Sequence, residues 1–196
     1  SDLQPLLRKQ SELTVVMGSP AKDRWDGIPP ERIGELRDTT KADNVIVEAD
    51  GSRGRLMKAP AAHEPSMPPI ANVVMPVASL AVVGKTLTTA SVHRAELVAE
   101  LLKLQPGSLL RLNHVAEVLL ADTGGLKNTP IQSRIWPVLT RTDTIDQDDL
   151  TKIIKRLIRH PRVIGVVTAD RNWMFEALAA GDAEDAEATT ACLNDT

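Results

Sequence analysis

The chain has 196 residues and a mass of 21.2 kDa, a length that suits one domain with its own hydrophobic core. Apolar residues make up 42% of the chain and charged residues 25%, which excludes a fibrous or wholly disordered protein. The formal net charge is −3, and residues 181–196 contain acids but no base, so the rest of the chain is close to neutral. A near-neutral body with no Tyr, one Phe and three Trp argues against nucleic-acid binding.

The cysteine content and the apolar runs indicate where the protein works. The single Cys192 allows neither an internal disulfide nor a cysteine-rich zinc site, and no secretory signal is visible, so we expect a cytoplasmic protein. A long uncharged run, residues 66–84, contains Pro68, Pro69 and Pro76. Two short strands and a turn explain this run better than a spanning helix, and we expect no membrane partner.

In the first two thirds of the chain, short apolar runs precede two helical patterns. β-Branched runs predict strands at residues 13–17 (LTVVM), 44–48 (NVIVE) and 72–77 (NVVMPV). Broad apolar faces predict helices over residues 92–105, which Pro106-Gly107 ends, and over residues 113–122.

The last third continues the alternation and decides the predicted fold class. The pattern predicts strands at residues 135–139 and 163–167 and helices over residues 146–160 and 172–180. The helix over 146–160 is the clearest, with acids near its start and bases towards its end, as the helix dipole favours. We therefore expect one α/β domain over residues 1–180, with a mostly parallel sheet flanked by helices, and a disordered acidic tail over residues 181–196.

Carboxylates follow the predicted strand at residues 44–48, at the end of the sheet where ligands bind in such folds. Glu48 and Asp50 have period-2 spacing and would face the same way, and Gly51 and Gly54 would allow a ligand close to the backbone. A magnesium–phosphate site needs one or two acids in such a place. The alternative is an ordinary strand end with an Asp-Gly turn.

The loop over residues 58–65 (KAPAAHEP) carries Lys58 and Glu64, and it is stiffened by Pro60 and Pro65. Lys58 could contact a phosphate or a carboxylate, or it could pair with an acid in a solvated connector. His93 and Arg94 open the predicted helix over 92–105, where the dipole disfavours cations. Either an anion or a salt bridge from Arg94 to Glu48 or Glu64 would explain their position.

A third polar strand exit, residues 139–143 (LTRTD), resembles a guanine-reading motif, with Thr140 and Asp143 in place and Arg141 where Lys is usual. The alternative is a strand-to-turn transition in which Thr144 or Asp146 caps the next helix. Residues 79–86 (SLAVVGKT) match a phosphate-binding loop only by chance, because the first Gly is missing and the intervening residues are apolar.

These strings occur together and in one order. The runs VEADGSRGRLMKAPAAHEP, SVHRAE, ADTGGLKNTP and VLTRTD resemble the YqeC-type proteins, described as selenium-dependent molybdenum hydroxylase accessory proteins or selenium cofactor biosynthesis proteins. The resemblance covers residues 43–143 and implies a P-loop NTPase-like fold and a role in maturing a molybdenum hydroxylase.

The resemblance also implies roles for particular residues. Glu48 and Asp50 match the acids of a Walker-B-like position, where they would hold Mg²⁺ beside a nucleotide, GTP or ATP. Catalytic roles would fall on these acids and on Lys58 and Glu64. The remaining matching positions would contact the nucleotide: Gly51, Ser52, Arg53, His93, Arg94, Thr140 and Asp143.

The chain departs from the family in one respect, since no Gly-rich phosphate-binding loop precedes residue 44. We expect either an N-terminally incomplete domain or a member that has lost the loop. At most, the chain would be a nucleoside triphosphatase that works with a molybdenum hydroxylase or its maturation proteins. The alternative function is a non-catalytic scaffold domain that holds a protein client or a small anion with Arg53, Lys58 and Arg94.

Overall fold

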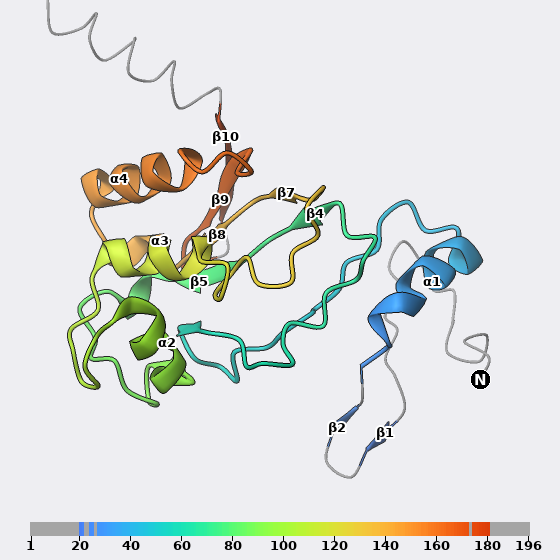
Figure 1. Cartoon of the computed structure of the whole chain (residues 1–196). Helices are drawn as coiled ribbons and strands as arrows, with labels where there is room; N and C mark the ends of the chain where they lie inside the picture. Colours follow the sequence, from blue (N-terminus) through green and yellow to red (C-terminus); the bar gives the residue numbers. More distant parts are fainter. Residues whose placement is uncertain (1–19, 22–23, 26, 173, 181–196) are drawn as a thin grey trace, which may run out of the picture.

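The structure, a computed structural model, describes residues 20–21, 24–25, 27–172 and 174–180. The predicted strand at residues 13–17 and the acidic tail at residues 181–196 lie outside these ranges. Strands and helices are interspersed along the described chain, with several strands and two of the helices following one another directly (Figure 1).

The main sheet has four strands in the order β10-β9-β8-β5. β5 (Val77–Ser79), β8 (Val138–Thr140) and β9 (Gly165–Ala169) run parallel, and β10 (Phe175–Ala179) lies antiparallel to β9. The parallel strands with helices packed on them confirm the predicted α/β fold class.

Two prolines divide the predicted strands at residues 72–77 and 135–139. β4 (Val73–Val74) and β7 (Arg134–Ile135) form a parallel pair just upstream of the main sheet. Pro76 separates β4 from β5 and Pro137 separates β7 from β8, because proline has no N–H for the strand ladder. The two predicted strands are therefore in the right place, but each is divided in two at a proline.

Three helices pack with the sheet: α2 (Ala95–Leu102), α3 (Leu112–Leu120) and α4 (Gln147–Ile158). α3 contacts α2 and α4 and also reaches β5, while α4 lies against β9 (Figure 1). The largest fully buried core side chains come from these elements and their connections, and include Leu80, Leu87, Val98, Leu110, Val115, Leu139, Ile153 and Leu157.

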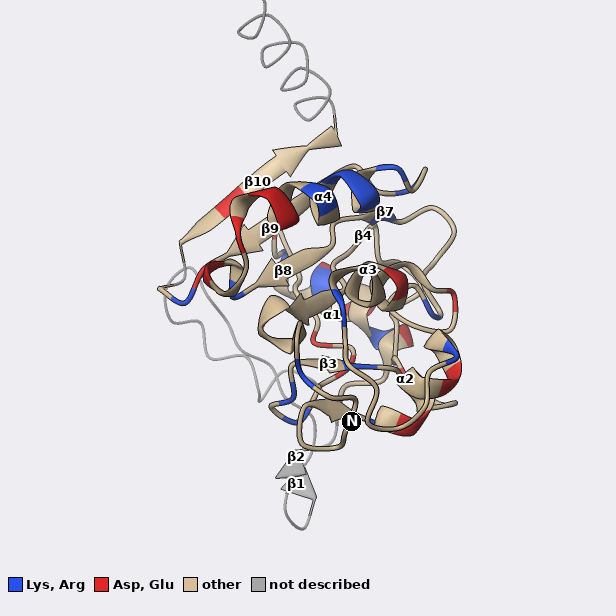
Figure 2. Ribbon diagram, turned by 90° about the vertical axis from the view of Figure 1, so that its left-hand side faces the viewer, with Lys and Arg blue, Asp and Glu red and all other residues tan. Residues whose placement is uncertain are grey.

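α4 confirms the clearest helix prediction to within two residues at each end. Asp146 is its N-cap and accepts a hydrogen bond from the backbone N–H of Asp149 at 2.8 Å. Its first turn is acidic and its last turn is basic, a separation visible as red and blue ribbon in Figure 2. α3 likewise matches the helix predicted over residues 113–122.

The strand predicted at residues 44–48 is wrong for this structure, which has no regular element between residues 44 and 56. This segment runs from α1 (Ile33–Thr40) towards the main sheet (Figure 1). A β-branched run forms a strand only where a neighbouring backbone completes its ladder, and residues 44–48 have no such partner among the described residues. Accordingly, the side chain of Ile46 is 96% exposed.

Two further predictions are corrected by pairing between distant segments. Residues 172–180 do not form a helix, because residues 175–179 pair with β9 as β10. The helix predicted over residues 92–105 starts only at Ala95, because Val92 and His93 pair in parallel with β3 (Met57–Lys58) as β6. The strand predicted at residues 163–167 is displaced to β9, two residues further on.

The remaining elements are short. β1 (Pro20–Ala21) and β2 (Arg24–Trp25) form an antiparallel pair, and η2 (Pro30–Arg32) leads into α1. The loop-like match at residues 79–86 forms a 3-10 turn, η3 (Leu80–Val82), and no α-helix follows at once. No helix in the described part of the chain combines the length and the apolar character that a membrane crossing requires.

Candidate functional site

The candidate site lies where the β3–β6 pair meets the end of β5. In this pair Lys58 stands opposite His93, so two predicted site residues that are 35 positions apart share one rung. The backbone N–H of Ser79 donates to the carbonyl oxygen of Leu56 at 2.8 Å and joins the pair to the main sheet. Backbone pairing therefore brings the 58–65 loop and the start of α2 together at the carboxyl end of β5.

Lys58 is the central cation of the site. Its Nζ contacts a carboxylate oxygen of Asp50 and also donates to Gly51 O at 2.9 Å and to Glu64 Oε2 at 3.2 Å. The Lys58 side chain is only 13% exposed, so these contacts replace most of its hydration. The sequence left two roles open for Lys58, contact with a ligand or pairing with an acid of the chain. In this structure Lys58 pairs with acids.

Glu64 and Arg94 form a two-point ion pair. Arg94 Nη1 donates to Glu64 Oε2 at 2.6 Å, and Nη2 donates to Oε1 at 2.8 Å. This confirms that Arg94 forms a salt bridge at the start of the helix, with Glu64 rather than Glu48 as its partner. Arg94 has a left-handed backbone, with φ of +54°, at the junction between β6 and α2. A non-glycine residue there costs about 1–3 kcal/mol and needs support from its surroundings.

The Glu64 carboxylate is held ionised by its neighbours. Burial alone would raise its pKa, but hydrogen bonds from Arg94, from the backbone N–H of Ala61 and from Lys58 outweigh burial and lower the pKa to about 2. Glu64 therefore joins both cations as a permanent anion at neutral pH. The peptide bond that follows it, Glu64–Pro65, is cis.

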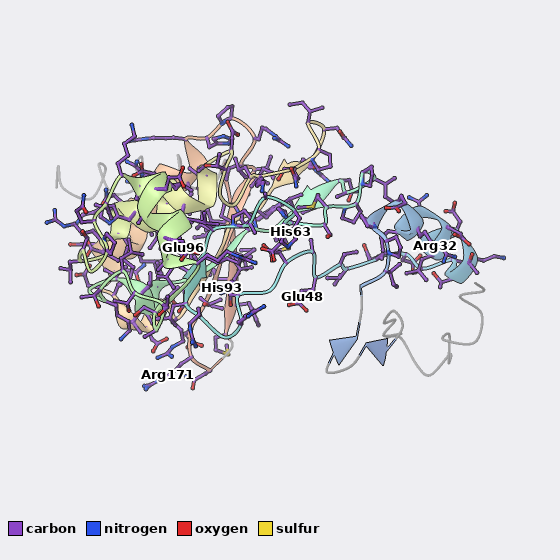
Figure 3. The ribbon with its side chains drawn as sticks, turned by 60° about the horizontal axis from the view of Figure 1, so that its bottom comes forward. Arg32, Glu48, His63, His93, Glu96 and Arg171 are labelled. Carbon is purple, nitrogen blue, oxygen red and sulfur yellow. The ribbon has the colours of Figure 1, made fainter. Side chains whose placement is uncertain are left out.

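Two of the histidines lie near this pair, and Figure 3 places His63 and His93 in the same region as Glu48. Burial lowers the pKa of His93, and the charges of Arg94, Lys58 and Arg53 lower it further. His93 is therefore mainly neutral at pH 7, able to donate or accept a hydrogen bond. His63 is exposed, with Nε2 3.7 Å from Glu64 Oε1.

Glu48 and the turn after it form the open side of the site. An added Cβ on Gly51 would lie 3.4 Å from Glu48 Oε1, which places this carboxylate over the Gly51 backbone. Glu48 is exposed and makes no hydrogen bond or ion pair with any residue that the structure describes. Ser52 closes the turn through its Oγ, which donates to Arg55 O at 2.9 Å, and Arg53 has a φ of +53°.

Thr140 and Asp143 lie at the carboxyl end of β8. This strand is the neighbour of β5, at whose end Lys58 is found. Thr140 pairs in register with Ser79 of β5, and Asp143 lies in η4 (Thr142–Thr144). The Asp143 carboxylate accepts from Arg141 Nε at 3.3 Å and from the backbone N–H of Arg171 at 2.9 Å. Burial would raise the pKa of Asp143, but Arg141 and the backbone N–H groups of Asp143 and Arg171 lower it. Asp146, not Thr144, caps the next helix.

The cluster combines three carboxylates (Glu48, Asp50 and Glu64) with the cations Lys58, Arg94 and Arg53, so its charges nearly balance when His93 is neutral. Within the described ranges, no group of three or more His, Cys, Asp or Glu is arranged to hold a metal ion. Magnesium usually needs fewer protein ligands, one or two carboxylates beside substrate phosphates, so the magnesium site at Glu48 and Asp50 stays a prediction.

Sequence reasoning missed several residues that shape the site. Lys127 and Asn128 donate to backbone carbonyls of the 61–65 loop, although they follow it by more than 60 residues. Ser79, which is 9% exposed at the end of β5, has an Oγ without a hydrogen-bond partner among the described residues. The ADTGGLKNTP string contains Lys127 and Asn128, but nothing in the sequence indicated which carbonyl groups they bind.

Comparison with known proteins adds family information. Residues 3–96 match the family model described as "YqeC protein", a range that contains the cluster through Arg94 but neither Thr140 nor Asp143. The chain is 34% identical over 111 residues to "Uncharacterized protein YqeC" of Escherichia coli (strain K12). No solved structure matches the chain.

The match with the Escherichia coli protein covers 56% of this chain and 43% of the relative, so it spans less than half the length of that protein. The family match begins before residue 20 and includes the EADGSRG and HEP strings on which the sequence resemblance rests. The two matches agree with each other and with those motifs, and they show that this part of the chain is similar to YqeC proteins.

Proposed function

We propose that this chain is an accessory protein in the maturation of a selenium- or molybdenum-dependent hydroxylase and that it binds a magnesium nucleotide, GTP or ATP, at the cluster around Lys58. One observation carries the proposal. Motif residues separated by up to 44 positions, from Asp50 to Arg94, form one ion-pair network at the carboxyl end of β5. Ligands bind at such strand ends in α/β folds.

Glu48 and Asp50 are the residues that would hold Mg²⁺. The Glu48 carboxylate has no partner among the described residues and is exposed, which suits a hard, strongly hydrated cation. The Asp50 carboxylate is paired with Lys58, so ligation through Asp50 requires Lys58 to turn towards Glu64 or towards a phosphate. Bound Mg²⁺ would neutralise phosphate charge.

The charge balance predicts that nucleotide binding depends on magnesium. Arg94 and Lys58 already have carboxylate partners, so a phosphate must compete with Glu64 and Asp50 for them. A nucleotide alone would bring several negative charges into a neutral cluster, whereas its magnesium complex brings fewer. We therefore expect weak binding of free nucleotide and tighter binding of the magnesium complex.

The base is expected to lie towards Asp143, and this part of the proposal rests on the order of the strands. β8 follows β5 in the sheet, and parallel neighbours are about 4.8 Å apart, so the end of β8 is within nucleotide length of Lys58. A guanine would have to replace Arg141 or the Arg171 backbone N–H at the Asp143 carboxylate. GTP and ATP are therefore both tested.

Thermal melting and calorimetry of the full chain with Mg-GTP, Mg-ATP, GDP and each nucleotide without magnesium test the binding step. Ligand at 100 times its dissociation constant stabilises a protein by about 2.7 kcal/mol, which raises the melting temperature of a chain of this size by roughly 5–11 °C. We expect such a shift only with magnesium. Glu48→Gln and Asp50→Asn should abolish it while the unliganded melting temperature changes little, and the exposed Glu117→Gln on α3 is the matched control.

Two results would contradict this binding site. One is the absence of any nucleotide-dependent shift in the wild-type chain. The other is unfolding of both Glu48→Gln and Asp50→Asn, which would make the pair structural. The maturation role is tested separately, in cells that make a molybdenum hydroxylase but lack the YqeC-type protein. Supplying this chain should raise hydroxylase activity per hydroxylase polypeptide, and Glu48→Gln should not.

The second candidate function is a non-catalytic domain that holds a protein client or a small anion. The observation in its favour is that Lys58 and Arg94 are paired with carboxylates of the chain itself. Neither cation therefore needs a phosphate to balance its charge. Phosphate release from Mg-GTP or Mg-ATP separates the two functions. Turnover that Asp50→Asn removes favours the nucleotide-dependent function, and binding without turnover favours the scaffold.

A further inference from the structure

Residues 127–133 run beside the segment that carries Glu64 and contact its backbone at several points. Four side chains of this run donate to carbonyl oxygens of residues 61–71: Lys127 to Ala61 and Ala62, Asn128 to Pro65, Gln132 to Pro69, and Ser133 to Ala71. The contacts follow the same order along both segments, and the β4–β7 strand pair continues them. We call residues 127–133 the strap.

Lys127 is the strap residue nearest the candidate site. Its Nζ contacts the carbonyl oxygen of Ala61 and donates to that of Ala62 at 3.1 Å, and it forms no salt bridge with an acid of the described chain. The same Ala61 carbonyl accepts the backbone N–H of Glu64 at 3.0 Å, and the Ala61 N–H donates to Glu64 Oε2 at 3.2 Å. Lys127 therefore binds the turn that fixes the Glu64 carboxylate.

The strap is itself fixed to α3. An added Cβ on Gly124 would lie 2.3 Å from the carbonyl oxygen of Val118, and one on Gly125 would lie 2.3 Å from that of Leu119. The backbone N–H of Gly125 donates to Val118 O at 2.8 Å, and Leu126 is buried in a second apolar cluster. Lys127 directly follows the buried Leu126. The position of the Lys127 backbone is therefore fixed by the packing of this segment against α3.

We infer that Lys127 is a positioning residue for Glu64: it holds the turn over residues 61–64 so that one carboxylate meets both Lys58 and Arg94. Asn128 supports the same turn through Pro65 O at 3.1 Å. Both strap residues act through the backbone of the 61–65 loop, and the ligand-binding consequence of this inference rests on the proposed function. The strap accordingly couples the end of α3 to the geometry of the site.

The groups that face Glu64 come from three segments. Lys58 belongs to β3, Arg94 follows β6, and His63 lies in the same loop as Glu64. His93 and Asp50 act at longer range, through charge or through Lys58. Loss of the Lys127 contacts would leave all these groups in the chain but would release the carboxylate from its place between Lys58 and Arg94.

NMR titration of the Glu64 side-chain carboxyl, in the full folded chain, tests the inference. In the wild type we expect Glu64 to stay ionised to low pH, in keeping with its pKa of about 2. Lys127→Met should raise the pKa of Glu64 towards the ordinary value of 4.5, and Lys127→Arg, which keeps cationic donors, should largely restore the wild-type titration. Lys85→Met, at an exposed lysine whose side chain forms no hydrogen bond or ion pair with the described residues, should change nothing.

A merely structural role of Lys127 would lower stability without changing the Glu64 titration, and that result would overturn the inference. Asn128→Gly is the second variant in case Lys127→Met does not fold, because glycine adopts the left-handed backbone of this position, with φ of +55°, without strain. It removes one contact from an exposed side chain and should raise the pKa of Glu64 by a smaller amount. An unchanged titration in this variant, with Lys127→Met unfolded, would equally overturn the inference.

Nucleotide binding provides a separate measurement. If the proposed function holds, Lys127→Met should weaken Mg-GTP or Mg-ATP binding by about tenfold, the equivalent of about 1.4 kcal/mol. If the wild-type chain binds neither nucleotide, the proposed function fails, while the Glu64 titration still decides the role of Lys127. If binding is unchanged although the titration shifts, Lys127 positions Glu64 but Glu64 does not contribute to binding.

Discussion

Arg94 and Glu64, thirty residues apart, form a two-point ion pair in which each guanidinium Nη donates to one carboxylate oxygen, at 2.6 and 2.8 Å. Their side chains are 19% and 21% exposed. A planar fork of this kind fixes orientation as well as distance. The pair therefore links the start of α2 to the 61–65 loop and gives the candidate site its shape before any ligand arrives.

Glu64→Gln is expected to destabilise the protein. The change leaves Arg94 and Lys58 as partly buried cations without their shared anion, at a cost of about 2 kcal/mol. Urea unfolding followed by circular dichroism measures the difference. Glu117→Gln, at an exposed glutamate on α3, should stay within about 0.5 kcal/mol of the wild type. Equal stability of the two variants would show that the ion pair contributes nothing net.

The same carboxylate predicts how stability depends on pH. Its folded pKa of about 2 lies below the ordinary 4.5, so Glu64 contributes stability that is fully present above pH 4.5 and disappears as pH falls towards 2. The full effect is about 3 kcal/mol if the unfolded chain has the ordinary value.

Denaturant unfolding at several pH values between 5.5 and 3 tests this dependence. Other carboxyls with lowered pKa values, such as Asp143 and Glu35, weaken every variant in the same window. The relevant quantity is thus the free-energy difference between the wild type and Glu64→Gln, which should shrink as the solution is acidified. A constant difference would mean that Glu64 titrates normally.

Gly125→Ala should distort the connection between α3 and the strap. The new Cβ would lie 2.3 Å from Leu119 O and within 3.0 Å of two further Leu119 backbone atoms, which cannot rotate away. Overpacking of this kind costs about 1–3 kcal/mol. Thermal melting measures the cost, with Gly27→Ala as the control because no atom lies within 4 Å of its added Cβ. Equal melting temperatures would show that the turn moves freely.

Asp146→Ala should weaken α4 by about 1 kcal/mol, because it removes the side-chain acceptor for the N–H of Asp149. Asp148 lies two residues after Asp146, in the first turn of α4. It is exposed and makes no capping bond, so Asp148→Ala is the matched control. Urea unfolding should separate the two variants, since only Asp146→Ala loses a cap. A larger loss for Asp148→Ala would contradict this assignment.

The helices α3 and α4 could be predicted from sequence because each depends on information within the helix. Apolar residues three and four apart define the buried face of α4, and Asp146 caps it locally. Residues 172–180 carry a similar apolar content, yet they form β10, because β9 offers them an open strand edge. Residues 44–48 show the opposite case, an apolar run without a strand partner in the described chain.

The candidate site divides in the same way. The strings around Asp50, Lys58 and Glu64 identified the polar residues, and the misplaced charge of Arg94 pointed to a partner. Sequence could not choose between Glu48 and Glu64 as that partner, because the two carboxylates differ in position by tertiary contacts alone. It also gave no indication of the Ala61 and Ala62 carbonyls that Lys127 binds.

By itself the sequence determined the α/β class, the two best helices and the set of polar residues that a YqeC-type motif contains. These depend on side-chain periodicity and residue type, which are local properties. The tertiary structure decided which acid meets which base, where the strands pair and which loop the strap holds, since several of these contacts join residues 30 to 66 positions apart. Contacts of that range depend on backbone pairing and packing across the fold, and no short segment encodes them.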